Sequence, residues 1–315
     1  MPEHKTPPPV ALALVLATVV VAIQALLVPL FAWPSANLKP RDLPIVVAGP
    51  APATSAIAQR LAAAEPGAFD VTVLPDGAAA DAALRDRQAY AAFVVGADGV
   101  NLHTAPGASP VVANLLTAAA QPMGEGRPVP VTVVVPASPD DPLGAGFSSG
   151  FLPLGLTSLV AGILFALLVK ARWARLAGLG AYAVLAGLVG GAVLQFWLGL
   201  LNGAYLANAA ALGLFALAVS SAVTGLGAVL GRPGLGLGVL LVFVFGIPLS
   251  AVAAAPELLP QPWGAMGQWL PIGAGASLLR STAFFDGAGV TGPLWILVGW
   301  AVAGLALVTV GRAKV

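Results

Sequence analysis

Residues 207–230 read ANAAALGLFALAVSSAVTGLGAVL and contain no Asp, Glu, Lys or Arg. A bilayer core of about 30 Å needs about 20 apolar residues in a helix that rises about 1.5 Å per residue. This stretch meets that length, and its polar side chains are limited to Asn, Ser and Thr. It therefore predicts a membrane-spanning helix.

The rest of the chain has the same character. It is 58% hydrophobic and only 9% charged, whereas soluble domains carry about 25% charged residues. Six segments are long enough to span: Val10–Phe31, Phe147–Val169, Leu176–Leu201, Ala207–Leu230, Leu235–Ala255 and Pro293–Val310. The predicted fold is an α-helical polytopic membrane protein with six transmembrane helices and an extracytoplasmic α/β domain inserted between helices 1 and 2. The expected divisions are 1–32, 33–146 and 147–315.

The first apolar segment resembles a signal peptide but is longer. Its run from Val10 beyond Val28 exceeds the 7–15 residues typical of a cleaved core. Phe31, Trp33 and Pro34 occupy the place of a small-residue cleavage site. We interpret this segment as an uncleaved anchor.

Basic residues predict the orientation. Positive charge concentrates in cytoplasmic loops, and one orientation places almost every basic residue that flanks a span on the same side. Those residues are Lys5, Lys170, Arg172, Arg175, Arg232, Arg312 and Lys314. Arg280 is the one basic residue in the opposite short loops. We expect a multi-pass inner or plasma membrane protein with cytoplasmic termini and residues 33–146 outside.

Residues 33–146 hold most of the acidic residues, so they are expected to face water. Five stretches are predicted strands: Ile45–Ala48, Phe69–Leu74, Ala91–Val95, Val100–Thr104 and Val129–Val135. Three helices are predicted between them, capped by Thr54, Asp76 and Ser109. The order β-α-β-α-β-β-α-β indicates a compact α/β domain.

This domain carries no recognisable catalytic motif. His103 is expected at a solvated strand position, and Asp81, Arg85, Asp86 and Arg87 are expected on an exposed helix face of mixed charge. The chain has no Cys and two His, which leaves too few ligands for a zinc site. None of its four lysines follows a glycine-rich phosphate loop. We expect no enzyme activity, cofactor or metal, and the near-zero net charge argues against a nucleic-acid partner.

Polar side chains within the spans are few and uncharged. Gln195, Ser220, Ser221 and Thr224 are the candidates for a polar path, and interhelical hydrogen bonding is the alternative. Gly187 with Gly191, and Gly227 with Gly231, form small-xxx-small pairs that favour close helix packing.

The segment 256–292 is too short and broken to span. Trp263 and Trp269 suit the headgroup layer, and Arg280 lies in a helix-like stretch, Ala274–Phe285. We interpret this part as a re-entrant or interfacial hairpin and as a candidate outer gate. Pro248 is expected to kink the helix before it.

Two stretches carry a family resemblance. They are residues 76–85 (DGAAADAALR) with 90–95 (YAAFVV), and residues 256–260 (PELLP) with Leu270-Pro271 and Leu278-Leu279-Arg280. With the order of helix, outer domain and five helices, they resemble the phage-infection-protein (YhgE/Pip-like) membrane family, which is related to type-2 ABC transporter permeases. The resemblance implies a permease component, a separate ATPase subunit and a homodimer.

The chain departs from that pattern on the cytoplasmic side. The tail Met1–Pro9 is short, and the loop 170–175 offers little surface to an ATPase. Two functions therefore stay open. One is export of a lipophilic or envelope-destined substrate. The other is a membrane scaffold or receptor whose outer domain binds a partner in envelope assembly or secretion.

Overall fold

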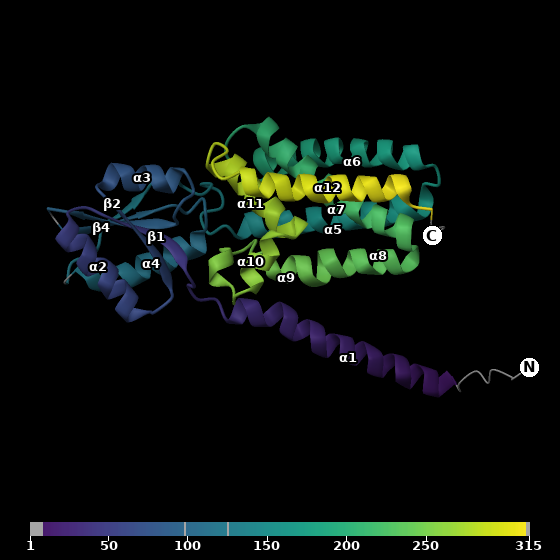
Figure 1. The fold of residues 1–315 in the computed structure, drawn as a ribbon, viewed down its shortest axis with the longest axis horizontal. Helices are drawn as coiled ribbons and strands as arrows, with labels where there is room; N and C mark the ends of the chain where they lie inside the picture. Colours follow the sequence, from purple (N-terminus) through teal and green to yellow (C-terminus); the bar gives the residue numbers. More distant parts are fainter. Residues whose placement is uncertain (1–8, 98, 125, 313–315) are drawn as a thin grey trace, which may run out of the picture.

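The computed structural model describes residues 9–97, 99–124 and 126–312. It is mostly helical, with a small sheet at one end (Figure 1). Six of the described helices are long and apolar enough to cross a membrane, which confirms the predicted number. They are α1 (Pro9–Ala36), α5 (Ala145–Leu168), α6 with its π-helical end (Arg172–Trp197), α7 (Tyr205–Leu230), α8 through α9 (Arg232–Leu249) and α12 (Thr291–Val310). The expected tail 1–8 and Lys314 lie outside the described residues.

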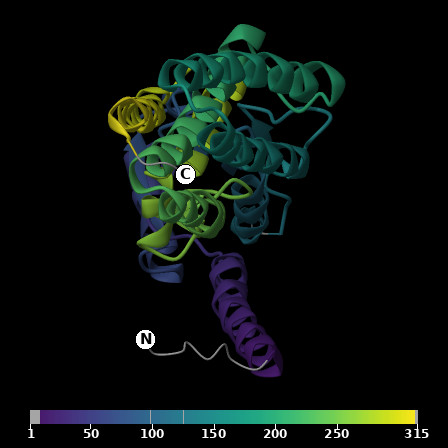
Figure 2. The same cartoon turned by 90° about the vertical axis from the view of Figure 1, so that its right-hand side faces the viewer.

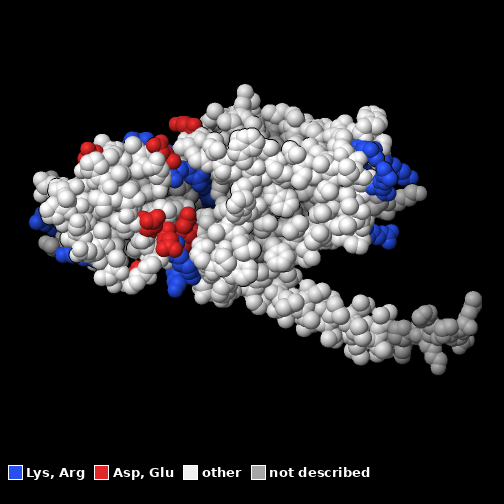
Figure 3. Space-filling view, in the orientation of Figure 1, with Lys and Arg blue, Asp and Glu red and all other residues white. Residues whose placement is uncertain are grey.

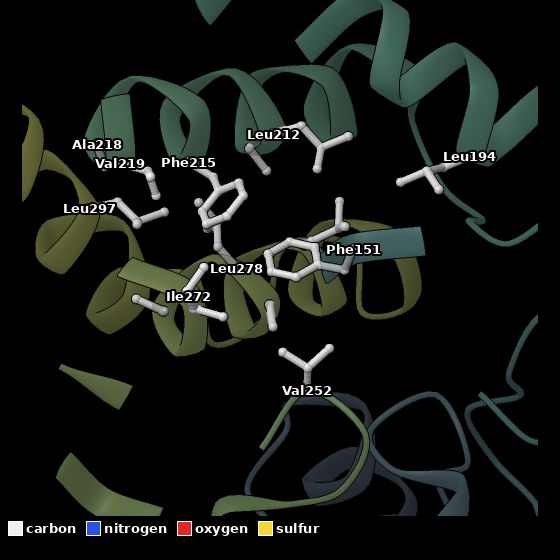
Figure 4. Packing of buried hydrophobic residues seen from close by; sticks show 14 of the residues in the cluster. Phe151, Leu194, Leu212, Phe215, Ala218, Val219, Val252, Ile272, Leu278 and Leu297 are labelled. Carbon is white, nitrogen blue, oxygen red and sulfur yellow. The ribbon is translucent and has the colours of Figure 1, made fainter. Parts of the chain in front are cut away.

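Helix α7 is the centre of the bundle. It packs against α5, α6, α8, α11 (Pro271–Phe284) and α12. Phe215 of α7 meets Phe151 of α5 with ring centroids 4.7 Å apart, and Ile272 of α11 belongs to the same buried cluster (Figure 4). An apolar helix that is enclosed on nearly all sides explains why residues 207–230 have no polar face.

Glycines bring α6 and α7 together. A Cβ at Gly187 would overlap the carbonyl oxygen of Ala209 and lie 2.9 Å from the Gly213 nitrogen. This contact agrees with the predicted packing role of Gly187. The interpretation of Gly231 was wrong, because that residue follows α7 with φ +68° and forms the turn into α8. Glycine is favoured there because L side chains rarely adopt positive φ.

Helix α1 stands apart from the other five helices (Figures 1 and 2). Its side chains are almost all exposed. Contact with the bundle is limited to its last turns, where the Phe31 ring lies 5.7 Å from that of Phe243. Each Å² of this apolar surface left in water forgoes about 25 cal/mol, so exposure to water disfavours this helix.

The sheet and its helices form the part that we call the α/β unit, residues 43–135. Its strands are β1 (Leu43–Ala48), β2 (Phe69–Leu74), β3 (Ala91–Gly96), β4 (Gly99–Thr104) and β5 (Val131–Val133). The sheet order is β2-β1-β3-β4-β5. Only the β3–β4 pair is antiparallel, with Phe93 opposite Leu102. The predicted order of strands and helices is confirmed.

Helices cover both faces of this sheet. On one face lie α2 (Ala51–Ala64) and α4 (Pro110–Ala120), with the short 3₁₀ turn Gln121–Gly124 after α4. On the other face lies α3 (Gly77–Arg85), as Figure 1 shows. Asp76 and Ser109 cap their helices as predicted, accepting from the nitrogens of Ala79 and Val112. The Thr54 cap was wrong: α2 begins at Ala51, and the Thr54 hydroxyl donates to the Ala51 carbonyl oxygen.

The fifth long helix ends earlier than expected. The prediction extended it to Ala255, but the helix stops at Leu249, after a π-helical segment Leu240–Gly246 that lies just before Pro248. Residues beyond it leave the helix because they join another core. Ala251, Ala254 and Leu258 are buried in the cluster that includes the strands of the α/β unit.

The remaining elements fill the junction between bundle and sheet. They are the 3₁₀ turn Pro256–Leu258, α10 (Trp263–Gln268) and α11. Most residues of α11 are buried, among them Arg280 and Ser281. The faces of α11 are covered by α7, α12 and the neighbouring segments, so this helix is enclosed by protein.

Candidate binding site at the junction

A cavity of about 240 Å³ lies between the α/β unit and the bundle. We call it the junction cavity. Arg87 and Tyr90 line it from the α/β unit, Ser277 from α11, and Glu257 from the turn before α10. Its wall is richer in polar surface than those of the other large cavities.

Arg87 connects the two parts of the molecule. It follows α3 with φ +58°, a conformation that is uncommon for any residue with a side chain. Its Nη1 donates to the Ser277 carbonyl oxygen at 3.0 Å and to the Ser281 hydroxyl. Its guanidinium carbon also lies 5.3 Å from the centre of the Phe285 ring. The prediction of an exposed mixed-charge face was wrong for Arg87, which is partly buried against α11.

Tyr90 and Glu257 form the second contact across the junction. The Tyr90 hydroxyl donates to Glu257 Oε2 at 2.9 Å, and the Tyr90 nitrogen donates to the Pro44 carbonyl oxygen. Burial, with the nearby Glu257 charge, raises the pKa of Tyr90 above its ordinary value. Burial lowers the pKa of Arg87, against the opposing influence of Tyr90 and Glu257. The tyrosine therefore stays neutral and acts as a donor to the carboxylate.

Arg280 is a second buried guanidinium beside this site. It is 8% exposed, donates from Nη2 to the Val252 carbonyl oxygen, and lies 4.6 Å above the Phe147 ring. Within the described residues, neither Arg280 nor Arg87 has a carboxylate oxygen within 4.0 Å. Arg280 lies in α11, which agrees with the predicted helix-like stretch Ala274–Phe285, and its side chain is buried next to the start of α5.

The candidate polar path lies elsewhere. Ser221 and Thr224 of α7 donate to the carbonyl oxygens of Ala301 in α12 and Gly162 in α5, at 3.4 and 3.0 Å. Ser220 bonds within its own helix. Gln195 sits at the sheet-side end of α6 and accepts from Asn208 at 3.0 Å. The Ser221 and Thr224 hydroxyls thus join α7 to α12 and α5, and none of the four candidate residues lines the junction cavity.

The predicted tryptophans lie on the surface of the bundle. Trp269 is 70% exposed and forms an apolar groove with Trp295 and Trp300, whose Nε1 donates to the Trp269 carbonyl oxygen at 2.9 Å. Trp263 is the first residue of α10 and is 37% exposed. The structure does not bring either tryptophan to Arg280 or to the junction cavity.

His103 is not a solvated strand residue, as was predicted. Its side chain is 12% exposed, and Nδ1 lies 2.6 Å from Asp81 Oδ1 of α3. Asp81 also lies 3.9 Å from Arg85 at the helix surface. The contact between His103 and Asp81 joins α3 to β4. In the described part of the chain, no nucleophilic side chain is hydrogen-bonded to the imidazole.

Sequence reasoning missed Arg87 and Glu257, and only Glu257 carried a signal that could have revealed it. Arg87 lies beside ordinary exposed charges, so no local pattern marks it as a buried residue. Glu257 did carry a signal, because it is one of two carboxylates beyond Asp141, and an isolated charge between apolar segments is often functional.

The arrangement is suited to binding a polar ligand. It offers a guanidinium, a carboxylate and hydroxyls around one cavity, and the described residues contain no cluster of three or more metal-ligating side chains. The chain matches no protein-family profile, no curated protein sequence and no solved structure.

Proposed function

We propose that the chain is a membrane permease component of the type-2 ABC kind that exports a lipophilic or envelope-destined substrate. The observation that carries this proposal is the junction cavity, where the α/β unit is bonded to the short helix α11 at one end of the bundle. A ligand held there would contact both parts at once. Movement of α11 would then change the cavity, as an exporter's outer site requires.

The proposed topology places the α/β unit outside the cell. Its support is the distribution of charge in Figure 3, where basic residues gather at the end of the bundle far from the sheet. Those residues occupy the α5–α6 link, the α7–α8 turn and the end of α12. Every described Asp and Glu lies in the α/β unit or in the segments beside it. This asymmetry is the one expected when the basic end faces the cytoplasm.

The packing of the bundle favours a lipophilic substrate over an ion. Its centre is filled by aromatic and aliphatic side chains such as Phe151 and Phe215, and its spans have no charged residue away from their ends. An ion would need polar groups along its path. A lipophilic substrate can instead pass along the apolar outer surface, for example the open space beside α1.

Any ATP hydrolysis would reside on a separate chain, and a homodimer is the assembly that we propose. The far end offers an ATPase few contacts, since α7 and α8 are joined through Gly231 alone and α5 and α6 through three residues.

Deletion of the gene tests the proposal. We expect altered export of an envelope molecule, or altered sensitivity to toxic amphiphiles, restored by the wild-type gene and poorly by Arg87→Gln. Unchanged export and unchanged sensitivity across a panel of amphiphiles would contradict it.

A scaffold or receptor is the second candidate, favoured by the open edges of the sheet. β2 and β5 each pair on one side only, and Val131 and Val133 of β5 are exposed. An edge strand of this kind can accept a strand from a partner. Co-purification in mild detergent separates the two: an ATPase partner supports export, whereas envelope or secretion proteins without an ATPase support scaffolding.

A further inference from the structure

The junction cavity contains two opposite charges that do not pair with each other. Arg87 and Glu257 both line it, yet their charged atoms are more than 4.0 Å apart, outside the distance of an ion pair. Removing unpaired charges from water costs several kcal/mol per ion. A ligand that supplies one charge to each would recover part of this free energy.

Arg87 has donors to spare. Nη1 makes both of its hydrogen bonds to α11, and no protein acceptor within the described residues bonds its Nη2 or Nε. Among described residues, Asn208 Oδ1 is the only fully enclosed side-chain nitrogen or oxygen without a hydrogen-bond partner, so Arg87 Nη2 and Nε are not fully enclosed. The remaining Arg87 N–H groups are therefore reachable from the cavity that this residue lines. A guanidinium with free N–H groups is suited to phosphate or carboxylate oxygens.

Glu257 is held in place by one hydrogen bond and can accept further hydrogen bonds. Tyr90 donates to Oε2, and no donor bonds Oε1 in the described part of the chain. A carboxylate has about four lone-pair sites, so it can accept an ammonium group as well. Glu257 is also the one acidic residue of the cavity wall.

We propose that the junction cavity binds a small zwitterionic group, with its anionic oxygens on Arg87 and its ammonium on Glu257. Its volume of about 240 Å³ is below the range of about 300–1,000 Å³ typical of drug-sized ligands. It therefore suits a headgroup and not a whole lipid. The same chemistry is present in an aminophospholipid headgroup and in free phosphoethanolamine.

Binding to the purified full-length protein tests this inference. Native mass spectrometry from detergent would compare phosphatidylethanolamine with phosphatidylglycerol, which has the phosphate but lacks the amine. We expect the wild type to favour phosphatidylethanolamine about tenfold, equivalent to about 1.4 kcal/mol. Glu257→Gln should bring the two lipids within about twofold, because the amide still accepts from Tyr90 but has no negative charge.

Further variants separate the two charges. Arg87→Gln should weaken both lipids, because the phosphate loses its partner. Arg85→Gln is the matched control, since this neighbouring arginine has a 62% exposed side chain and lies outside the cavity. It should bind as the wild type does. Competition by millimolar phosphoethanolamine would identify the free compound as a ligand, and retained lipid discrimination without competition would identify the lipid.

Equal affinity of the wild type for the two lipids, or a preference that Glu257→Gln leaves unchanged, would overturn the inference. The wild-type comparison is decisive even if a variant fails to fold. The inference rests on the proposed function only in regarding the bound headgroup as part of the substrate. Binding is measured without cells, so a failure of binding is distinguishable from a failure of export.

Discussion

Arg87 and Ser277 are 190 residues apart in the chain, and Arg87 Nη1 donates to the Ser277 carbonyl oxygen at 3.0 Å. This bond joins the α/β unit to α11, the short helix enclosed by the bundle. A movement of either part must therefore break the bond or carry the other part along.

Arg87→Ala should loosen the junction. It removes hydrogen bonds from a charged donor to the Ser277 carbonyl and Ser281 hydroxyl, each contributing about 1.5–3 kcal/mol. We expect faster amide hydrogen exchange in α11 and in β3, with Arg85→Ala as the control. Exchange that is the same in both variants and in the wild type would show that this contact does not hold the two parts together.

Gly187 should be far more sensitive to substitution than Gly180 on the same helix. A Cβ at Gly187 meets backbone atoms of α7, whereas a Cβ at Gly180 has no atom within 4 Å. Gly187→Ala should lower stability by about 1–3 kcal/mol through overpacking, and Gly180→Ala should leave it unchanged or slightly raised. Thermal unfolding in one detergent measures both. Equal effects would contradict the close approach of α6 and α7.

Asp81 and His103 should stabilise the α/β unit as a coupled pair. Their 2.6 Å contact is largely shielded from water, so a double-mutant cycle with alanine should give a coupling of about 1 kcal/mol or more. The cycle for Asp81 with the exposed Arg85, 3.9 Å away, should give less than about 0.5 kcal/mol. Additive single substitutions at 81 and 103 would show that the contact contributes nothing.

Tyr90→Phe should have an effect that depends on pH. At pH 8 the variant should be less stable by about 1–3 kcal/mol, because Glu257 loses its donor. The folded state holds the pKa of Tyr90 above its ordinary value of 10.0. Above pH 10 the unfolded wild type therefore loses this proton while the folded state keeps it. The free energy of unfolding of the wild type should then fall relative to that of Tyr90→Phe, by up to about 1.4 kcal/mol per pH unit.

Unfolding midpoints of the two proteins from pH 8 to pH 11 measure this difference. The gap between wild type and Tyr90→Phe should narrow as the pH rises. A gap that stays constant or widens would contradict the burial of a neutral hydroxyl at position 90.

Much of the fold was predictable because its signals are local. Helices long enough to span follow from unbroken apolar runs. In the α/β unit the strands follow from alternation, and the helices follow from periodicity and from capping residues such as Asp76. The end of the fifth long helix was not predictable in this way. Ala251 and Ala254 are apolar whether they face lipid or the core of the α/β unit, and composition does not separate the two environments.

The candidate site was harder to predict because it depends on contacts distant in the chain. Arg87 becomes a junction residue only through its positive φ and the position of α11, neither of which its neighbours in sequence specify. Arg280 was identified from sequence as part of a helix-like stretch and a candidate outer gate, but its buried contacts were not predicted. Its burial beside Phe147 depends on packing between α11 and α5.

The most direct test of the central claim is the sidedness of the two ends of the molecule. The chain has no Cys, so Arg85→Cys and Arg172→Cys each introduce a single reporter at an exposed position, and the wild type serves as the blank. A membrane-impermeant maleimide applied to intact cells should label position 85, and should label position 172 only after lysis. Labelling of position 172 in intact cells, with position 85 protected until lysis, would contradict the proposed topology.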